Sequence, residues 1–357
     1  MPLDPTKLKA KHTFNAPCTF FGMAYDAVSN RAYCGGDDNL VYVFDLATAA
    51  KKFEPVAKWN GGHDNYISCV VAIERAGKKL VVTGGYDKNL VWWNPDKGEV
   101  VRTVPAHGGW VRDLIATPDG SKLISCGDDM LVKVWDADTG KPIATLDGHA
   151  KLTPQGHVTA LYALAISRDG QLVASADRHG DVRVWNLADG KQIGAFAAPT
   201  LYTYDARQRK RSLGGIRAVA FSPDASLIAV GGMGQVDNVD GLAGKVRLEV
   251  WEWRKPLARF TSGAENHTGM IGALQFHPKE PWLVGSGGGG DNAFVAFWKT
   301  DVIPAEIDPK QKADPVKNHR IKGDGFFHRL ATLPGGTEFV TAGHKKFIVW
   351  TTEEKKA

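Results

Sequence analysis

One strand ending recurs seven times along the 357-residue chain. Each copy alternates apolar and polar residues and ends on an aromatic residue followed by a polar one, as in LVKVWD at residues 131–136. Alternation with a period of two predicts a β-strand, and repetition at intervals of 42 to 66 residues predicts a repeat architecture. The seven aromatic residues are Phe44, Trp93, Trp135, Trp185, Trp251, Trp298 and Trp350.

A second element lies upstream of most of these endings, an apolar strand that runs into a turn. Examples are IATPDG at residues 115–120, AISRDG at 165–170 and AFSPDA at 220–225. In four copies a histidine precedes the end of this strand by nine positions, namely His63, His107, His157 and His267. The two elements in register resemble the WD-repeat family, and the resemblance covers nearly the whole chain. It implies four-stranded antiparallel blades, so we expect an all-β, seven-bladed propeller in which residues 1–357 form a single domain.

The two ends of the chain are expected to meet in one blade. Only seven residues follow Trp350, too few for a further strand and its turn. Residues 11–16, KHTFNA, read like the outer strands VVRTVPA and PIATLDG. We therefore expect the N-terminal strand to pair in the last blade and close the ring, because an open propeller would leave sheet edges unpaired.

The resemblance assigns a structural role to residues that could be mistaken for catalytic ones. In the family, a histidine, a hydroxyl, an aspartate in a hairpin turn and the tryptophan form a buried hydrogen-bond chain, which requires every member to be satisfied. Such a set could instead be a nucleophile, base and acid, but a set repeated in several blades is expected to support the fold. The matching residues are His63, Thr83, Asp87 and Trp93; His107, Ser125, Asp129 and Trp135; and His157, Ser175 and Trp185, with His179 in the place of the aspartate.

Charge and composition disfavour several classes of protein. The formal net charge of +5 is mild compared with dedicated nucleic-acid-binding domains, and no apolar run approaches the length of a membrane span. The four cysteines have neither C-x-x-C nor zinc-site spacing. We expect a cytoplasmic protein, monomeric on its own, with no membrane attachment, no cofactor, no metal ion and no catalytic residues.

Long insertions fall on the connections expected at one face of the propeller. They are residues 150–156, 197–215, 233–245 and 301–322, and insertions on one face of a repeat array often mark a binding face. The second insertion carries aromatic and basic residues that suit an acidic peptide, a phosphate or a nucleic-acid strand; a solvated charged loop is the other interpretation. These residues are Tyr202, Tyr204, Arg207, Arg209, Lys210 and Arg211.

WD-repeat proteins tend to bind partners through side chains around the channel mouth on this face. The resemblance places these side chains three and five residues after the repeat histidine and one before the turn aspartate, and aromatic residues and arginine are enriched at binding hot spots. We expect a non-catalytic scaffold that binds a protein partner here, with an acidic segment as a suitable ligand. Nucleic-acid binding through residues 201–211 is one alternative, and an enzyme with a small molecule or metal in the channel is another. The expected partner-binding residues are Tyr66, Trp110, Arg112, Tyr162, Arg178, Arg217, Met270, Phe326, His328 and Asp128, and Tyr86 occupies the position before a turn aspartate.

Overall fold

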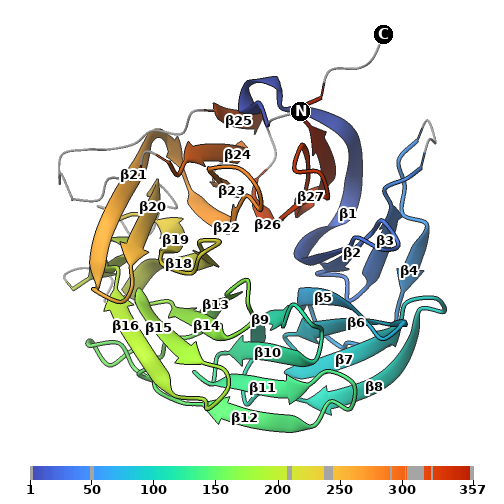
Figure 1. Ribbon diagram of the computed structural model, residues 1–357, viewed down its shortest axis with the longest axis horizontal. Coiled ribbons are helices and arrows are strands. Elements are labelled where there is room, and N and C mark those ends of the chain that lie inside the picture. Colours follow the sequence, from blue (N-terminus) through green and yellow to red (C-terminus); the bar gives the residue numbers. More distant parts are fainter. Residues whose placement is uncertain are drawn as a thin grey trace. The chain divides into compact units, whose positions relative to one another are not determined.

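The structure, a computed structural model of the chain, is built almost entirely from β-strands. It describes residues 3–48, 52–206, 211–236, 244–289, 292–301, 303, 317–322 and 325–353. Over this part of the chain the helical segments are two 3-10 turns, η1 (Pro5–Lys7) and η2 (Pro199–Leu201). The strands form six sheets of the kind that make the blades of a β-propeller (Figure 1). The all-β propeller expected from the sequence is therefore confirmed.

The chain divides into two compact units, and each is described by itself. Unit 1 comprises residues 1–145 and 328–357, and unit 2 comprises residues 146–327. Unit 1 contains three sheets, with only one terminal residue each of β12 and β26 falling in unit 2. In spatial order these are β26 (Phe327–Thr332), β27 (Glu338–Thr351), β1 (Lys9–Asp26), β2 (Arg31–Gly36), β3 (Val41–Asp45) and β4 (Ala57–Trp59); then β5 (Ile67–Arg75), β6 (Lys78–Gly85), β7 (Asn89–Asn94) and β8 (Glu99–Pro105); then β12 (Pro142–Leu146), β11 (Val132–Asp136), β10 (Lys122–Gly127) and β9 (Val111–Ala116).

Unit 2 contains the other three sheets. They are β13 (Leu161–Ile166), β14 (Leu172–Asp177), β15 (Asp181–Asn186) and β16 (Gln192–Ala197); then β17 (Tyr202–Asp205), β18 (Arg211–Phe221), β19 (Ile228–Met233), β20 (Lys245–Glu252) and β21 (Leu257–Thr268); then β22 (Met270–Phe276), β23 (Trp282–Gly289), β24 (Asn292–Lys299) and β25 (Lys317–Lys322). We call β5–β8 the second blade, β9–β12 the third and β13–β16 the fourth.

Strand β1 pairs with two partners along its 18 residues. Its first part pairs antiparallel with β27, from Lys9 opposite Thr351 to Thr19 opposite His344. Its second part pairs with β2, beginning with Phe20 opposite Gly36. The N-terminal segment thus pairs with the last strand, as the sequence predicts, and joins what would be two blades into one six-stranded sheet.

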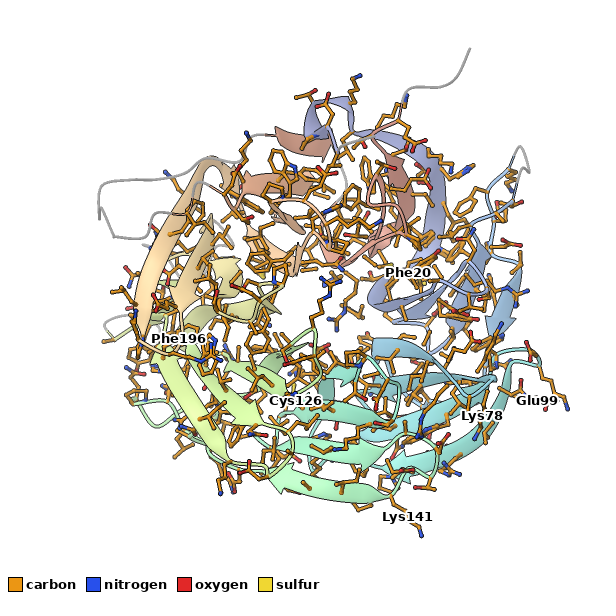
Figure 2. The ribbon with its side chains drawn as sticks, viewed as in Figure 1. Phe20, Lys78, Glu99, Cys126, Lys141 and Phe196 are labelled. Atoms are coloured by element: carbon orange, nitrogen blue, oxygen red, sulfur yellow. The ribbon has the colours of Figure 1, made fainter. Side chains whose placement is uncertain are left out.

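The core of this six-stranded sheet is aromatic. Phe44 from β3 stacks on Phe347 from β27 with ring centroids 4.4 Å apart, and Phe14 from β1 lies 5.3 Å from Phe44. All three rings are buried, so removing them from water supplies the main stabilisation at the junction of the chain ends. Charged residues of unit 1 such as Glu99 and Lys141 project outward, as Figure 2 shows.

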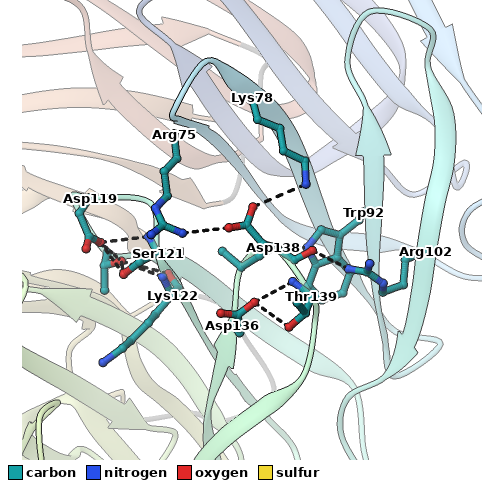
Figure 3. A network of polar contacts seen from close by, with 12 residues as sticks. Arg75, Lys78, Trp92, Arg102, Asp119, Ser121, Lys122, Asp136, Asp138 and Thr139 are labelled. Atoms are coloured by element: carbon teal, nitrogen blue, oxygen red, sulfur yellow. Dashed lines mark hydrogen bonds and ion pairs between the residues drawn. The ribbon is translucent and has the colours of Figure 1, made fainter.

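Polar contacts join the second and third blades near the beginning of β6. Asp138, in the turn between β11 and β12, accepts a 2.9 Å contact from Arg75 and lies 3.6 Å from Lys78 (Figure 3). Its backbone carbonyl accepts a hydrogen bond from Arg102. Both ion pairs are exposed, so each contributes at most a few tenths to about 1 kcal/mol, and their role is to fix how the two blades meet.

Candidate functional site

Four side chains of the second blade form a continuous hydrogen-bond chain. His63 Nδ1 lies 2.9 Å from Asp87 Oδ2, and His63 Nε2 lies 2.7 Å from Thr83 Oγ1. The indole N–H of Trp93 donates to the same hydroxyl at 2.9 Å. Two backbone N–H groups donate to the carboxylate and so hold it in position. The residues that the sequence grouped here lie together.

The third blade repeats this arrangement. His107 lies 2.9 Å from Asp129 Oδ1 through Nδ1 and 2.8 Å from Ser125 Oγ through Nε2, and Trp135 donates to that hydroxyl at 2.8 Å. Burial alone would raise the pKa of Asp129, but the hydrogen bond and charge of His107 lower it to about 2. Ser125 is fully buried. This hydroxyl therefore has no access to a substrate.

The assignment of His157 to the hydrogen-bond chain of the fourth blade is wrong. Trp185 donates to Ser175 Oγ at 2.9 Å, but the histidine on that hydroxyl is His149, with Nε2 at 2.8 Å. His157 lies half-buried beside the ring of Tyr204, with centroids 5.5 Å apart.

The cause of this error is the insertion at residues 150–156. It lies between the histidine and the strand, so counting nine positions back from the strand end reaches His157 instead of His149. The local dipeptide is the better signal, because Gly148–His149 repeats Gly62–His63.

Four rings of unit 1 follow one another in contact, which we call the aromatic row: Phe21, Tyr66, Tyr86 and Trp110. Successive ring centroids are 5.9, 5.7 and 4.2 Å apart, and the last two rings are nearly parallel, at 6°. Tyr66 and Trp110 are each 41% exposed. Phe21 was not found from the sequence because it lies in β1, where no repeat histidine gives a position from which to count.

Arg112 lies against the aromatic row, but its charge already has a partner. Its guanidinium carbon is 4.8 Å from the Trp110 ring centroid and 5.2 Å from that of Tyr86. Its Nε and Nη2 lie 2.5 and 3.0 Å from the two carboxylate oxygens of Asp128, and Nη1 donates to the Tyr86 hydroxyl at 3.1 Å. The structure brings together residues that the sequence selected separately, as an internal bidentate pair.

His328 and its neighbour Arg329 lie beside the row. The His328 ring is 4.8 Å from that of Phe21. Arg329, which the sequence analysis did not select, lies 3.0 Å from Asp113 and donates to the backbone carbonyls of Phe21 and Ser68 at 2.9 and 3.1 Å. This one guanidinium therefore holds several strands of unit 1 in place around the row, and no repeat motif marks it.

In unit 2 the structure pairs two of the predicted residues. The guanidinium carbon of Arg217 lies 3.8 Å from the ring centroid of Tyr162, a cation–π contact. The other predicted residues of this unit, Arg178, Met270 and Phe326, are half-buried.

The second insertion contains a hairpin, formed by β17 and β18. Tyr202 is 8% exposed and meets His179 edge-on at 4.7 Å, so its ring is not available to a ligand in the way the sequence suggested. Tyr204 is half-buried. Arg207, Arg209 and Lys210 lie outside the described residues, and of Arg211 only its backbone place in β18, opposite Asp205, is described.

Three of the four insertions contact one another within unit 2. The Tyr202 hydroxyl lies 3.5 Å from the Gln155 side-chain carbonyl, and Thr203 Oγ1 accepts a 3.0 Å hydrogen bond from the backbone N–H of Val236. The expectation that these insertions share one face agrees with these contacts.

Among the described residues, no helix has the length and apolar character needed to cross a membrane. The family model "WD domain, G-beta repeat" matches residues 98–136 and 140–186.

Similar proteins include the Nuclear distribution protein PAC1 of Arthroderma otae, 30% identical over 146 residues, which are 35% of this chain and 32% of that protein. The Nuclear distribution protein nudF 2 of Talaromyces marneffei is 34% identical over 106 residues, 24% of this chain and 23% of the relative. The Apoptotic protease-activating factor 1 of Rattus norvegicus is 26% identical over 152 residues, 43% of this chain and 11% of the relative. The matches thus span about a third or less of these relatives. WD repeats are thus identified in residues 98–136 and 140–186, and the hydrogen-bond chains of the second and third blades lie in propeller sheets of the kind that this resemblance implies.

Proposed function

We propose that this protein is a non-catalytic scaffold that binds a protein partner through the aromatic row of unit 1. The observation that carries the proposal is that Tyr66 and Trp110 each keep 41% of their surface exposed while their rings are stacked in a fixed row. Large rings held in one conformation lose little entropy on binding, and aromatic residues dominate binding hot spots.

The state of Arg112 changes the kind of partner we expect. Its guanidinium already pairs with both carboxylate oxygens of Asp128, so an acidic segment would have to compete with an internal anion. We therefore propose that apolar and aromatic contacts supply most of the affinity, and that Arg112 chiefly holds Trp110 and Tyr86 in position.

A non-catalytic role is supported by the hydrogen-bond chains. The hydroxyls of Thr83, Ser125 and Ser175 are all fully buried and each accepts from a tryptophan indole. A nucleophile must reach its substrate, whereas these groups face the interior of a blade. We assign them to the scaffold.

We also propose that the fold is a closed ring of seven blades. The two-partner strand β1 supports this, because dividing the six-stranded sheet at Phe20 gives two blades, which with the five other sheets make seven. All four cysteines are free and buried, which suits a reducing compartment such as the cytoplasm.

Deleting residues 1–16 tests ring closure. The deletion removes the pairing partner of β27 and exposes an edge that includes Phe347, so we expect a markedly lower melting temperature or aggregation. Cooperative melting at the full-length temperature would contradict the closed ring.

The binding proposal is tested by Trp110→Ala in quantitative capture of partners from native lysate. Loss of a central anchor of this kind costs about 2 kcal/mol or more, roughly thirtyfold in affinity. Lys97→Glu is the matched control, because Lys97 is exposed in the β7–β8 turn, at the end of β7 away from the Asp87 turn. Equal loss of the main partner in both variants, or loss in the Lys97 variant alone, would show that the binding face is misassigned.

A further inference from the structure

The fourth blade holds a buried cluster that the repeat does not require. His149, Asp177 and Asp181 each offer one ligand atom, and these atoms lie within 4.8 Å of one another. The exposed fractions of the three side chains are 1%, 3% and 24%. Carboxylates and an imidazole that converge in a buried place need a positive partner, because buried charges are costly unless they are compensated.

The geometry differs from that of an ordinary histidine–aspartate pair. In the second and third blades, Nδ1 of the histidine lies 2.9 Å from a carboxylate oxygen. Nδ1 of His149 lies 3.4 Å from Asp181 Oδ2 and 3.7 Å from Asp177 Oδ2, and it makes no hydrogen bond. Nδ1 of His149 thus lies between two carboxylates, at ion-pair distance from both and without the 2.9 Å contact of the other blades.

We propose that His149, Asp177 and Asp181 form a binding site for a divalent transition-metal ion such as Zn²⁺. Zinc lies about 2.0–2.2 Å from nitrogen and oxygen ligands. At about 2.05 Å, the two nitrogen–oxygen pairs, 3.4 and 3.7 Å apart, subtend angles of roughly 110° and 130°, each of which falls within the range of a distorted tetrahedron.

The surrounding contacts are those that orient metal ligands. Ser175 lies 2.8 Å from His149 Nε2, so with the metal on Nδ1 the Nε2–H donates to the serine and fixes the tautomer. Asp177 Oδ1 accepts two backbone N–H groups at 2.9 and 2.8 Å, which leaves Oδ2 directed to the cluster. Arg183 donates at 2.8 Å to Asp181 Oδ2, the same oxygen that faces His149 Nδ1, and so holds this carboxylate at the cluster.

The competing explanation is a protonated His149. Burial lowers the pKa of His149, but the two aspartates outweigh burial and raise it. An imidazolium, with Arg183, would also balance two carboxylates. However, an imidazolium is expected to close onto one carboxylate at hydrogen-bond distance, as the histidines of the other blades do, whereas a shared metal ion accounts for the wider spacing.

The test uses the full chain, freed of metal by a chelator and titrated with Zn²⁺ against a chromophoric competitor. We expect one Zn²⁺ per chain, at least about tenfold weaker in Asp177→Asn, which keeps the side-chain shape and the acceptor for the turn. Asp129→Asn is the matched control, because it alters a histidine–aspartate pair without a second carboxylate and should leave Zn²⁺ binding unchanged.

X-ray absorption of the zinc-loaded wild type keeps the proposal testable if Asp177→Asn fails to fold. We expect an imidazole and oxygen shell near 2.0–2.1 Å with no sulfur near 2.3 Å. Equal Zn²⁺ affinity in wild type and a folded Asp177→Asn would overturn the proposal. So would a sulfur ligand, absence of Zn²⁺ binding, or a His149 imidazole that stays doubly protonated at saturating Zn²⁺.

Discussion

The third and fourth blades share a buried serine and an indole, but they hold their histidines differently. In the third blade, His107 is hydrogen-bonded at both nitrogens, to Ser125 and Asp129. In the fourth, His149 is hydrogen-bonded only through Nε2, and its other nitrogen faces two carboxylates.

The difference originates in the turn between the second and third strands of each blade. The third blade has Asp128–Asp129 in this turn, where the fourth has Arg178–His179. In the fourth blade, Asp177 and Asp181, which lie two residues before and two residues after His179, face His149 instead. A repeat can therefore keep its scaffold hydroxyl and tryptophan while the charged end of the chain acquires a different chemistry.

The largest expected effect comes from removing the two histidines. His107→Ala leaves the buried Ser125 and Asp129 without a partner and should cost about 2 kcal/mol of unfolding free energy. Above the raised pKa of His149, where the imidazole is neutral, His149→Ala breaks one hydrogen bond instead of two and should cost about half as much in metal-free protein. Urea unfolding measures both, and an equal or greater loss for His149→Ala would remove the contrast between the blades.

A smaller effect is expected from acid. Because the pKa of Asp129 is lowered to about 2 from 3.8, the carboxylate contributes stability above pH 4 that is lost as the pH falls toward 2. With its partial exposure taken into account, the loss is about 1 kcal/mol. Asp129→Asn should remove this part of the pH dependence in urea unfolding between pH 5 and 2. An unchanged pH profile would show that the His107–Asp129 pair does not set it.

The smallest difference in unfolding free energy is expected at the tryptophan end, which the hydrogen-bond chains of the third and fourth blades share. Trp135 and Trp185 donate to their serines at 2.8 and 2.9 Å. Trp135→Phe and Trp185→Phe should therefore have similar costs, within about 0.5 kcal/mol of each other. A larger difference would mean that the blades also differ in packing, and double substitution with the histidine variants would locate it.

Much of the fold was predictable from the sequence because its signals are local and repeated. The strand endings with their aromatic residues and the pairing of residues 11–16 with the last strand all follow from short patterns. The assignment of His157 to the fourth blade was wrong because the insertion at residues 150–156 separates the true histidine, His149, from the strand whose end was used for counting. Within one blade, spacing is reliable only where the connecting loop keeps its length.

The binding surface was predictable in part. The rule for channel-mouth positions gave Tyr66, Trp110 and Arg112, which do lie together. It could not show that Arg112 is paired with Asp128, because side-chain ion pairs depend on three-dimensional approach. It also missed Phe21, whose strand carries no histidine of the repeat.

The two-partner strand β1 has a consequence for how the chain is made. Lys9 leaves the ribosome long before its neighbour in the sheet, Thr351, is made. Contacts of such long sequence separation form slowly, since the entropy of closing the loop must be overcome before pairing rewards it. Until β27 is made, the first half of β1 therefore stays an unpaired strand with buried-type side chains such as Phe14 exposed. If the first half of β1 pairs with the β27 of another copy, a strand-swapped assembly forms. A chaperone that binds the unpaired strand until β27 of the same chain is made would favour the monomer.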